Sequence, residues 1–169
     1  AGGAALALRA CHGDAVLTPS LQRRLLRMFQ TEWQDFSVGS AALKLLVILD
    51  EKPQEQALYP EMKRFALWLE DCGVQVKITD PAELEADASG VYLDGQRVDL
   101  IYNRHCDFYL DDEAMSGIRS AYLAAQVCLT PNPFVYGQLA DKRRMILWTQ
   151  ADKMQPLGLT DSELQLLQQ

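Results

Sequence analysis

The chain has 169 residues and a formal net charge of −7 at pH 7, from 16 Lys and Arg against 23 Asp and Glu. Its length suits one domain with its own core, and 49% hydrophobic against 23% charged residues excludes a largely disordered chain. The acidic balance argues against a nucleic-acid partner, which needs a basic face. The longest strand-like apolar run, Leu45–Leu49, is too short to cross a membrane, so no membrane association is expected.

The four cysteines, Cys11, Cys72, Cys106 and Cys128, show no C-x-x-C spacing. A chain that builds its own core does not need a disulfide framework, so we expect a reducing, cytoplasmic environment. Cys72 and Cys128 stand in apolar patterns and are predicted to be buried as small hydrophobic residues.

Both ends of the sequence resemble positions at which a longer chain has been cut. It starts with Ala1 and lacks the basic start and long apolar core of a signal peptide. It stops inside a helical pattern at residues 164–169. We therefore expect a piece of a longer protein.

The first predicted helix begins at Thr18 and Pro19, a hydroxyl cap followed by proline at the first helical position. Three arginines lie on its polar face, where a solvated surface is a better interpretation than a binding surface. They are Arg23, Arg24 and Arg27. The apolar positions recur at helical spacing and are Leu21, Leu25, Met28, Phe29, Trp33 and Phe36. Residues 38–40 end this segment.

Strands and helices alternate after this segment. Leu45–Leu49 is uniformly apolar, as expected of a strand buried on both faces. A helical stripe from Met62 to Cys72 ends at Gly73, and a second strand follows at residues 74–78. This order predicts a right-handed βαβ unit. Residues 80–83 resemble a capped helical turn with an acid three residues after the cap.

Asp94 and Gly95 separate two apolar runs, at residues 91–93 and 98–102, and predict a hairpin because both turn residues tolerate positive φ. A helix capped at residues 111–112 follows, and its inward positions are predicted to be Met115, Ile118, Tyr122 and Ala125. A short strand is predicted at residues 127–129 and a long helix at 134–148, with Leu139 and Ile146 facing the core. A capping box at Thr160 and Glu163 starts a last helix. The sum is a three-layer α/β/α, Rossmann-like fold with a mostly parallel sheet and flanking helices.

Ligands collect at the carboxyl ends of strands in such sheets. The segments there are 50–52, Asp80, 103–106 and 130–132. Arg104 has a planar fork that matches two oxygens of a carboxylate or phosphate, with Asp107 expected to hold the guanidinium in place. The alternative is that Arg104 only pairs with an acidic residue of the fold.

Other chemistry at these positions is not favoured. His105 and Cys106 are adjacent and point to opposite sides of a strand, so a nucleophile and base pair is not expected. A zinc site built from both residues with Cys11 and His12 lacks the usual ligand spacing. Neither a G-x-G-x-x-G nor a P-loop motif is present. The charged run at residues 141–144 is, on composition alone, a solvated turn.

Four segments carry a resemblance to a known family: VDLIYNR at 98–104, IRSAYLAA at 118–125, VCLTPNP at 127–133 and ADKRR at 140–144. They resemble the pre-ATP-grasp domain of glutathione-synthetase-like ATP-grasp proteins, especially the circularly permuted, glutathionylspermidine-synthetase-like branch. The likeness covers about residues 43–150. Residues 1–4, Ala-Gly-Gly-Ala, are similar to the end of the Gly-Gly loop that precedes this domain in permuted members.

The resemblance implies roles for five residues. Lys142 stands where ATP-grasp ligases place a lysine on the nucleotide phosphates, and Asp141 would orient its turn. Asn103 and Arg104 fall where the domain faces its substrate, and Asn132 ends the strand that leads toward the nucleotide domain. The chain lacks the family's glycine-rich lid, second lysine and magnesium-binding Glu and Asn residues. The resemblance therefore assigns this chain no catalytic residue and no metal ligand.

The family likeness divides the chain into a helical segment at 1–40, a pre-ATP-grasp-like domain at 41–150 and a helix at 151–169 leading toward the ATP-grasp part. It implies the substrate-side domain of an ATP-dependent carboxylate–amine or carboxylate–thiol ligase that is inactive by itself. ATP and magnesium would serve the parent protein without binding tightly here. The expected partners are a small carboxylate or peptide-like substrate and the remaining ATP-grasp part of the same polypeptide. The alternative is a stand-alone, non-catalytic α/β ligand-binding or interaction module.

Overall fold

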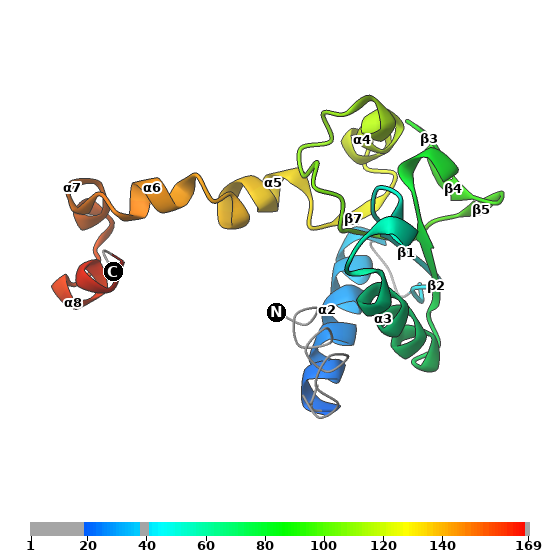
Figure 1. The fold of residues 1–169 in the computed structure, drawn as a ribbon, viewed down its shortest axis with the longest axis horizontal. Coiled ribbons are helices and arrows are strands. Elements are labelled where there is room, and N and C mark those ends of the chain that lie inside the picture. The colour runs from blue at the N-terminus through cyan, green and yellow to red at the C-terminus, as the bar shows by residue number, and fades with distance from the viewer. Residues whose placement is uncertain (1–18, 38–40, 168–169) are drawn as a thin grey trace. The chain divides into compact units, whose positions relative to one another are not determined.

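A four-stranded parallel sheet forms the centre of the structure, a computed structural model that describes residues 19–37 and 41–167. The strand order is β2-β1-β6-β7, so the first strand is central and both of its neighbours, β2 and β6, follow it in sequence. The strands are β1 (Leu45–Leu49), β2 (Gln75–Thr79), β6 (Leu100–Asn103) and β7 (Cys128–Thr130). The predicted α/β fold with a parallel sheet is confirmed (Figure 1).

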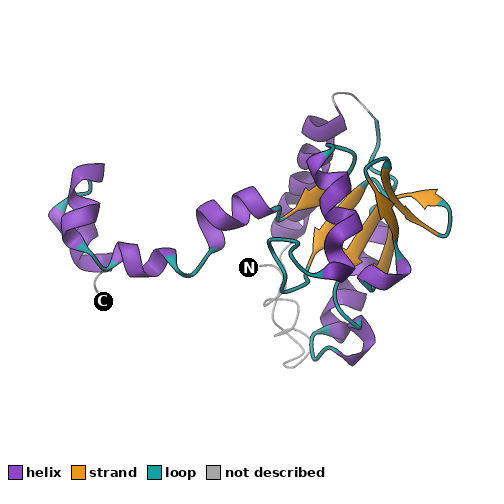
Figure 2. Cartoon of the chain, turned by 90° about the horizontal axis from the view of Figure 1, so that it is seen from above, coloured by secondary structure: helices purple, strands orange, loops and turns teal. Residues whose placement is uncertain are grey.

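Helices α2 (Pro19–Ser37) and α3 (Tyr59–Asp71) cover one face of this sheet. Three aromatic rings join the layers, because Phe29 of α2 lies 6.0 Å from Phe65 of α3 and 5.3 Å from Tyr102 of β6, measured between ring centroids. The tilted and edge-on ring geometry adds to the stabilisation from burying these side chains. The βαβ unit predicted from the sequence is therefore β1-α3-β2 (Figure 1). Figure 2 shows helices packed beside the strands of the sheet.

The opposite face carries helix α4 (Ser116–Leu123) and a small antiparallel sheet. That sheet consists of β3 (Glu85–Asp87), β4 (Gly90–Leu93) and β5 (Gln96–Arg97). Gly117 lets α4 approach β3 closely, because a Cβ at this position would overlap the carbonyl oxygen of Ala86. The two helical layers and the sheet between them make the three-layer arrangement that the sequence predicts.

The predicted hairpin forms, with a shorter second strand than expected. Asp94 and Gly95 have φ angles of 51° and 74°, and Leu93 pairs with Gln96, which defines a two-residue loop. The run at residues 98–102 does not continue the hairpin beyond the bond from the Val98 N–H to Val91. Asp99 turns the chain instead, because its carboxylate accepts the backbone N–H groups at the start of β1, and β6 joins the parallel sheet.

Two burial predictions are wrong because each residue belongs to a helix end. Cys72 is exposed at the C-cap of α3, where Gly73 supplies the left-handed residue. Ala125 is exposed and has a φ of 54°, since α4 ends at Leu123 and the N–H of Gln126 closes the last turn. Ala121 takes the inward position that the periodicity gave to Ala125. Cys128 is buried, as predicted.

The described residues fall in two compact units, which separate between Asn132 and Pro133. The second unit contains only short helices, and the predicted continuous helix at 134–148 is interrupted at Asp141, where ψ is 112°. Leu139 and Ile146, predicted to face a core, are 73% and 65% exposed. The capping box at Thr160 and Glu163 is confirmed. The elements are α5 (Pro133–Val135), a π-helical turn (Tyr136–Ala140), α6 (Arg144–Trp148), α7 (Ala151–Met154) and α8 (Asp161–Leu167).

Single 3-10 turns complete the described secondary structure, and they lie at Pro53–Glu55, Pro81–Glu83, Glu113–Met115 and Gln155–Leu157. Among the described helices, none combines the length and apolar character needed to span a bilayer.

Candidate small-molecule binding site

The strand order creates a switch point between β1 and β6. The connection from β1 crosses one face of the sheet through α3, whereas the connection from β6 crosses the other face through α4. Leu49 and Asn103 pair at the carboxyl ends of these two strands, so their following loops diverge from one place. Open α/β sheets bind ligands in the crevice at such a point.

A cavity of ≈ 350 Å³ lies at this switch point. The loop after β1 supplies one wall and the segment after β6 supplies the other. The volume is within the range of small-molecule pockets. The lining residues are Asp50, Glu51, Gln56, Ala57, Leu58, Arg104, His105 and Cys106.

Arg104 forms two parallel hydrogen bonds with Glu61, of 3.0 Å from Nη1 to Oε1 and 3.1 Å from Nη2 to Oε2. The expected partner Asp107 does not hold this guanidinium, since its carboxylate accepts the backbone N–H of Asp112. Burial alone would lower the pKa of Arg104, but its hydrogen bonds to Glu61 and the nearby Tyr102 raise the pKa overall. The backbone N–H of Arg104 also donates to Leu49, which extends the β1–β6 pairing.

Asn103 and His105 organise the turn that follows β6. The Asn103 Oδ1 accepts the backbone N–H of His105 at 3.1 Å, and the His105 Nδ1 accepts the N–H of Asp107 at 3.0 Å. The Nδ2 of Asn103 is buried and has no hydrogen-bond partner among the described residues. Asn103 therefore shapes the wall and is not itself part of the cavity lining.

Asp50 is 9% exposed and lines the cavity. Its Oδ1 accepts the N–H of Glu51 at 2.9 Å. Burial raises the pKa of the Asp50 carboxyl above its ordinary value of 3.8, against the lowering effect of the Glu51 hydrogen bond. The site thus contains a carboxylate that the fold has removed from water.

Asp80, at the end of β2, anchors the loop that bears the cavity wall. Its carboxylate accepts the backbone N–H of Lys52 at 2.7 Å and that of Ala82 at 2.8 Å. Burial would raise its pKa, but these bonds outweigh burial and lower it. The left-handed φ of 40° at Lys52 is held by this contact. The capping box predicted with Glu83 is present.

The remaining residues considered in the sequence analysis differ in their place relative to the cavity. Asn132 is half-buried after β7. Cys106 is exposed and His105 is buried, but both line the cavity, because they follow the end of β6 and do not lie on a strand as the sequence analysis assumed. Among residues 19–37 and 41–167, no group of three or more His, Cys, Asp or Glu side chains could hold a metal ion. Cys11 and His12 are outside the described residues.

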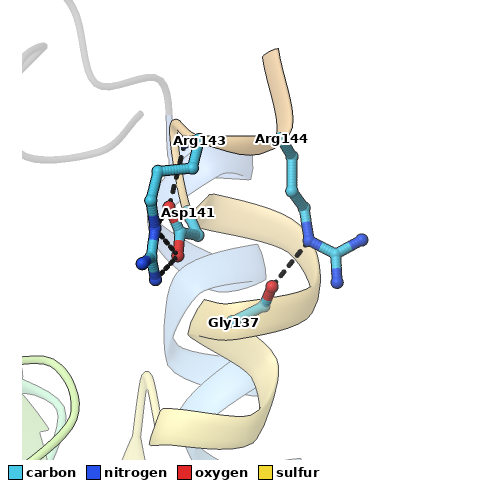
Figure 3. A network of polar contacts seen from close by, with 4 residues as sticks. All are labelled: Gly137, Asp141, Arg143 and Arg144. Carbon is cyan, nitrogen blue, oxygen red and sulfur yellow. Dashed lines mark hydrogen bonds and ion pairs between the residues drawn. The ribbon is translucent and has the colours of Figure 1, made fainter. Parts of the chain in front are cut away.

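Asp141 and Lys142 belong to the second unit and occupy a turn between two helical segments, not the interior of one helix. Figure 3 shows Asp141 in this turn with Arg143 and Arg144. Asp141 breaks the helix because its carboxylate accepts the backbone N–H of Arg143 at 2.9 Å. The same carboxylate pairs with the Arg143 guanidinium at 2.5 Å, and the Arg144 Nε donates to Gly137. The Lys142 side chain is exposed. The Asp141 carboxylate therefore holds this turn through its contacts with Arg143.

Glu61 is the functional-site residue that the sequence did not single out. It follows Pro60 in the first turn of α3, where an acidic residue is already favoured by the helix dipole. Nothing in its spacing distinguishes it from an ordinary solvated acid, yet its side chain is only 4% exposed. Its pairing with Arg104 depends on the register between β6 and α3.

No protein-family model matches this chain. No curated protein matches it either. The arrangement of the residues above is therefore the basis for a functional proposal.

Proposed function

We propose that this chain is the substrate-side domain of an ATP-dependent ligase that joins a carboxylate to an amine or a thiol, and that the switch-point cavity binds one of its small-molecule substrates. The cavity between the ends of β1 and β6 is the observation that carries the binding role. The ligase class is supported by the family resemblance of four segments, which fall on β6, α4, β7 and the turn before α6.

ATP and magnesium belong to this proposal only as groups of the parent protein. The described residues do not fit a magnesium site, because they contain no cluster of metal-ligating side chains and Asp141 is bound by Arg143. Lys142 offers one exposed ammonium for phosphate. We therefore derive no catalytic step through a magnesium–nucleotide complex on these residues.

Binding at the cavity is tested by NMR titration of the ¹⁵N-labelled chain with glutathione, a peptide-like compound with carboxylate, amine and thiol groups. We expect shifts at the backbone amides of Glu51, Ala57 and Cys106 at about 10 mM ligand or below. Ala57→Trp should abolish these shifts by filling the cavity. Ala82→Trp is the matched control, since Ala82 is also an exposed alanine in a loop but does not line the cavity. Shifts that are absent, or that survive Ala57→Trp, would refute the binding role.

The nucleotide role of Lys142 separates the ligase proposal from the alternative, a non-catalytic binding module. The ligase proposal expects calorimetry to detect weak ATP binding that Lys142→Met reduces about tenfold, the size of one charge-assisted contact. Thr149→Met is a control at another exposed position of the same unit. The chain alone should release no ADP. Magnesium-dependent ADP release that Lys142→Ala removes would contradict an inactive domain, and unchanged ATP affinity of Lys142→Met would favour the binding module.

A further inference from the structure

The charges on the cavity wall do not balance. Arg104 is the strongest cation of the lining, but its fork is bound by Glu61 and the pair is neutral as a whole. Two carboxylates, Asp50 and Glu51, remain on the wall. His105 is the one remaining residue of the lining that can carry a positive charge, and a single charge would not offset both carboxylates. The lining therefore presents net negative charge to a ligand.

Part of the negative charge of the lining lies on the Asp50 carboxylate. Its residue is nine-tenths buried, and its only hydrogen bond among the described residues reaches Oδ1 from the neighbouring N–H of Glu51. The other oxygen, Oδ2, has no donor in the described part of the chain. This oxygen is accessible from outside, because the Asn103 Nδ2 is the only buried side-chain polar atom without a partner among the described residues. An accessible carboxylate oxygen can accept a charged donor from a ligand.

We infer that the switch-point cavity binds its ligand through a primary ammonium group, with the Asp50 carboxylate as the main contact and Glu51 as a second acceptor. The exposed side chains of Ala57 and Leu58 line the same space and suit the alkyl chain that bears the ammonium. A compact ammonium offers three donors within a small radius, which matches two neighbouring carboxylates. The pKa of Asp50 is raised because burial outweighs the lowering effects of the Glu51 hydrogen bond and of the nearby His105 and Arg104.

This inference reverses the charge of the ligand group expected at Arg104 from the sequence. A carboxylate or phosphate in the cavity would compete with Glu61 for the guanidinium and would meet two negative charges. An ammonium leaves the Arg104–Glu61 pair intact. In the proposed ligase, the cavity would then hold the amine-bearing substrate, so the inference rests on the proposed binding role of the cavity.

The experiment compares three probes of similar size by NMR titration of the full 169-residue chain: n-butylamine, n-butanol and butyrate. We expect n-butylamine to shift the amides of Glu51, Ala57 and Cys106 with at least about tenfold higher affinity than the other two. Asp50→Asn should weaken n-butylamine binding about tenfold or more and leave n-butanol binding unchanged. Asp87→Asn is the matched control, because this exposed aspartate on β3 is outside the lining.

The outcomes separate the two proposals. Butyrate or n-butanol binding as tightly as n-butylamine, or Asp50→Asn binding n-butylamine normally, overturns the ammonium inference and leaves the cavity as a binding site. No probe, including glutathione, shifting the cavity amides overturns the binding role itself. Should Asp50→Asn fail to fold, Glu51→Gln tests the same charge at an exposed position and should weaken n-butylamine binding about threefold, with n-butanol unaffected.

Discussion

Arg104 and Glu61 lie on different elements and meet through two parallel hydrogen bonds of 3.0 and 3.1 Å. Arg104 follows the last residue of β6, and Glu61 lies in the first turn of α3. Their side chains are 17% and 4% exposed, so the pair is largely shielded from water. The contact fixes the beginning of α3 against the sheet edge that carries the cavity.

Removing either partner should destabilise the fold. Glu61→Gln and Arg104→Met should each lower the free energy of unfolding by about 3 kcal/mol, because the remaining charge stays buried without a partner. The double variant should lose less than the sum of the single losses. Urea denaturation measures all three values. Arg119→Met is the control, since the Arg119–Asp111 pair is exposed and should contribute little. Losses as small as those of the control would contradict a stabilising role of the Arg104–Glu61 pair.

Asp50→Asn should stabilise the protein at neutral pH. The pKa of Asp50 is raised by burial, so its ionised form is less favourable in the folded than in the unfolded chain. As pH rises above 3.8, the ordinary value, the unfolded chain ionises first, and wild-type stability falls until the raised folded pKa is passed. Asparagine does not ionise, so the Asp50→Asn variant does not lose this stability as pH rises. Chemical denaturation as a function of pH should show the two proteins diverging just above that value. Parallel curves would mean that Asp50 is not desolvated.

Gly117→Ala should destabilise the protein by about 3 kcal/mol, because the new Cβ overlaps a backbone carbonyl of β3 that no rotamer change can move. This exceeds the gain of about 1 kcal/mol that alanine brings to a helix. Gly73→Ala provides the comparison. Gly73 has a φ of 86° with open space around it, so alanine there costs only backbone strain of about 1–2 kcal/mol. Thermal unfolding of both variants checks the order, and an equal or smaller loss for Gly117→Ala would contradict the close approach.

The described cysteines should differ sharply in alkylation rate. Burial raises the pKa of Cys128 to about 12, so at about pH 8 almost none of it is thiolate, whereas Cys72 and Cys106 are exposed. Iodoacetamide labelling of the native chain, followed by peptide mass analysis, should modify Cys72 and Cys106 and spare Cys128. Labelling in urea is the control, because all three should then react. Modification of native Cys128 at the rate of Cys106 would place it outside the core.

The sequence predicted the sheet well because its signals are local. The uniform apolar run of β1 and the alternation in β2 identify strands from their own residues, and the order of elements then predicts parallel pairing. The hairpin turn was equally predictable from its two residues, Asp94 and Gly95. The helix ends were less predictable. A left-handed alanine at position 125 has no distinctive composition, unlike the glycine at position 73.

The candidate site was only half predictable, because its geometry depends on contacts between distant elements. The carboxyl ends of the strands were identified from the general behaviour of α/β sheets, and the cavity lies there. The partner of Arg104 was not predicted, since the Glu61 side chain reaches Arg104 only after α3 has packed against the sheet. The turn at Asp141 was missed for a different reason. The residues on both sides of Asp141 follow a helical period. This pattern did not indicate that the Asp141 carboxylate would accept the backbone N–H of Arg143 and end the helix.

Strand β1 acquires its two neighbours at different times during synthesis of the chain. β2 follows after one helix, but β6 follows only after the antiparallel sheet has also been made. Until then the nascent chain carries a central strand of Leu, Leu, Val, Ile and Leu with one open edge, the kind of segment that recruits other chains. Lys44 and Asp50 flank this run and act as charged gatekeepers during that interval. Asp50 would therefore protect the growing polypeptide before it lines a cavity in the finished one.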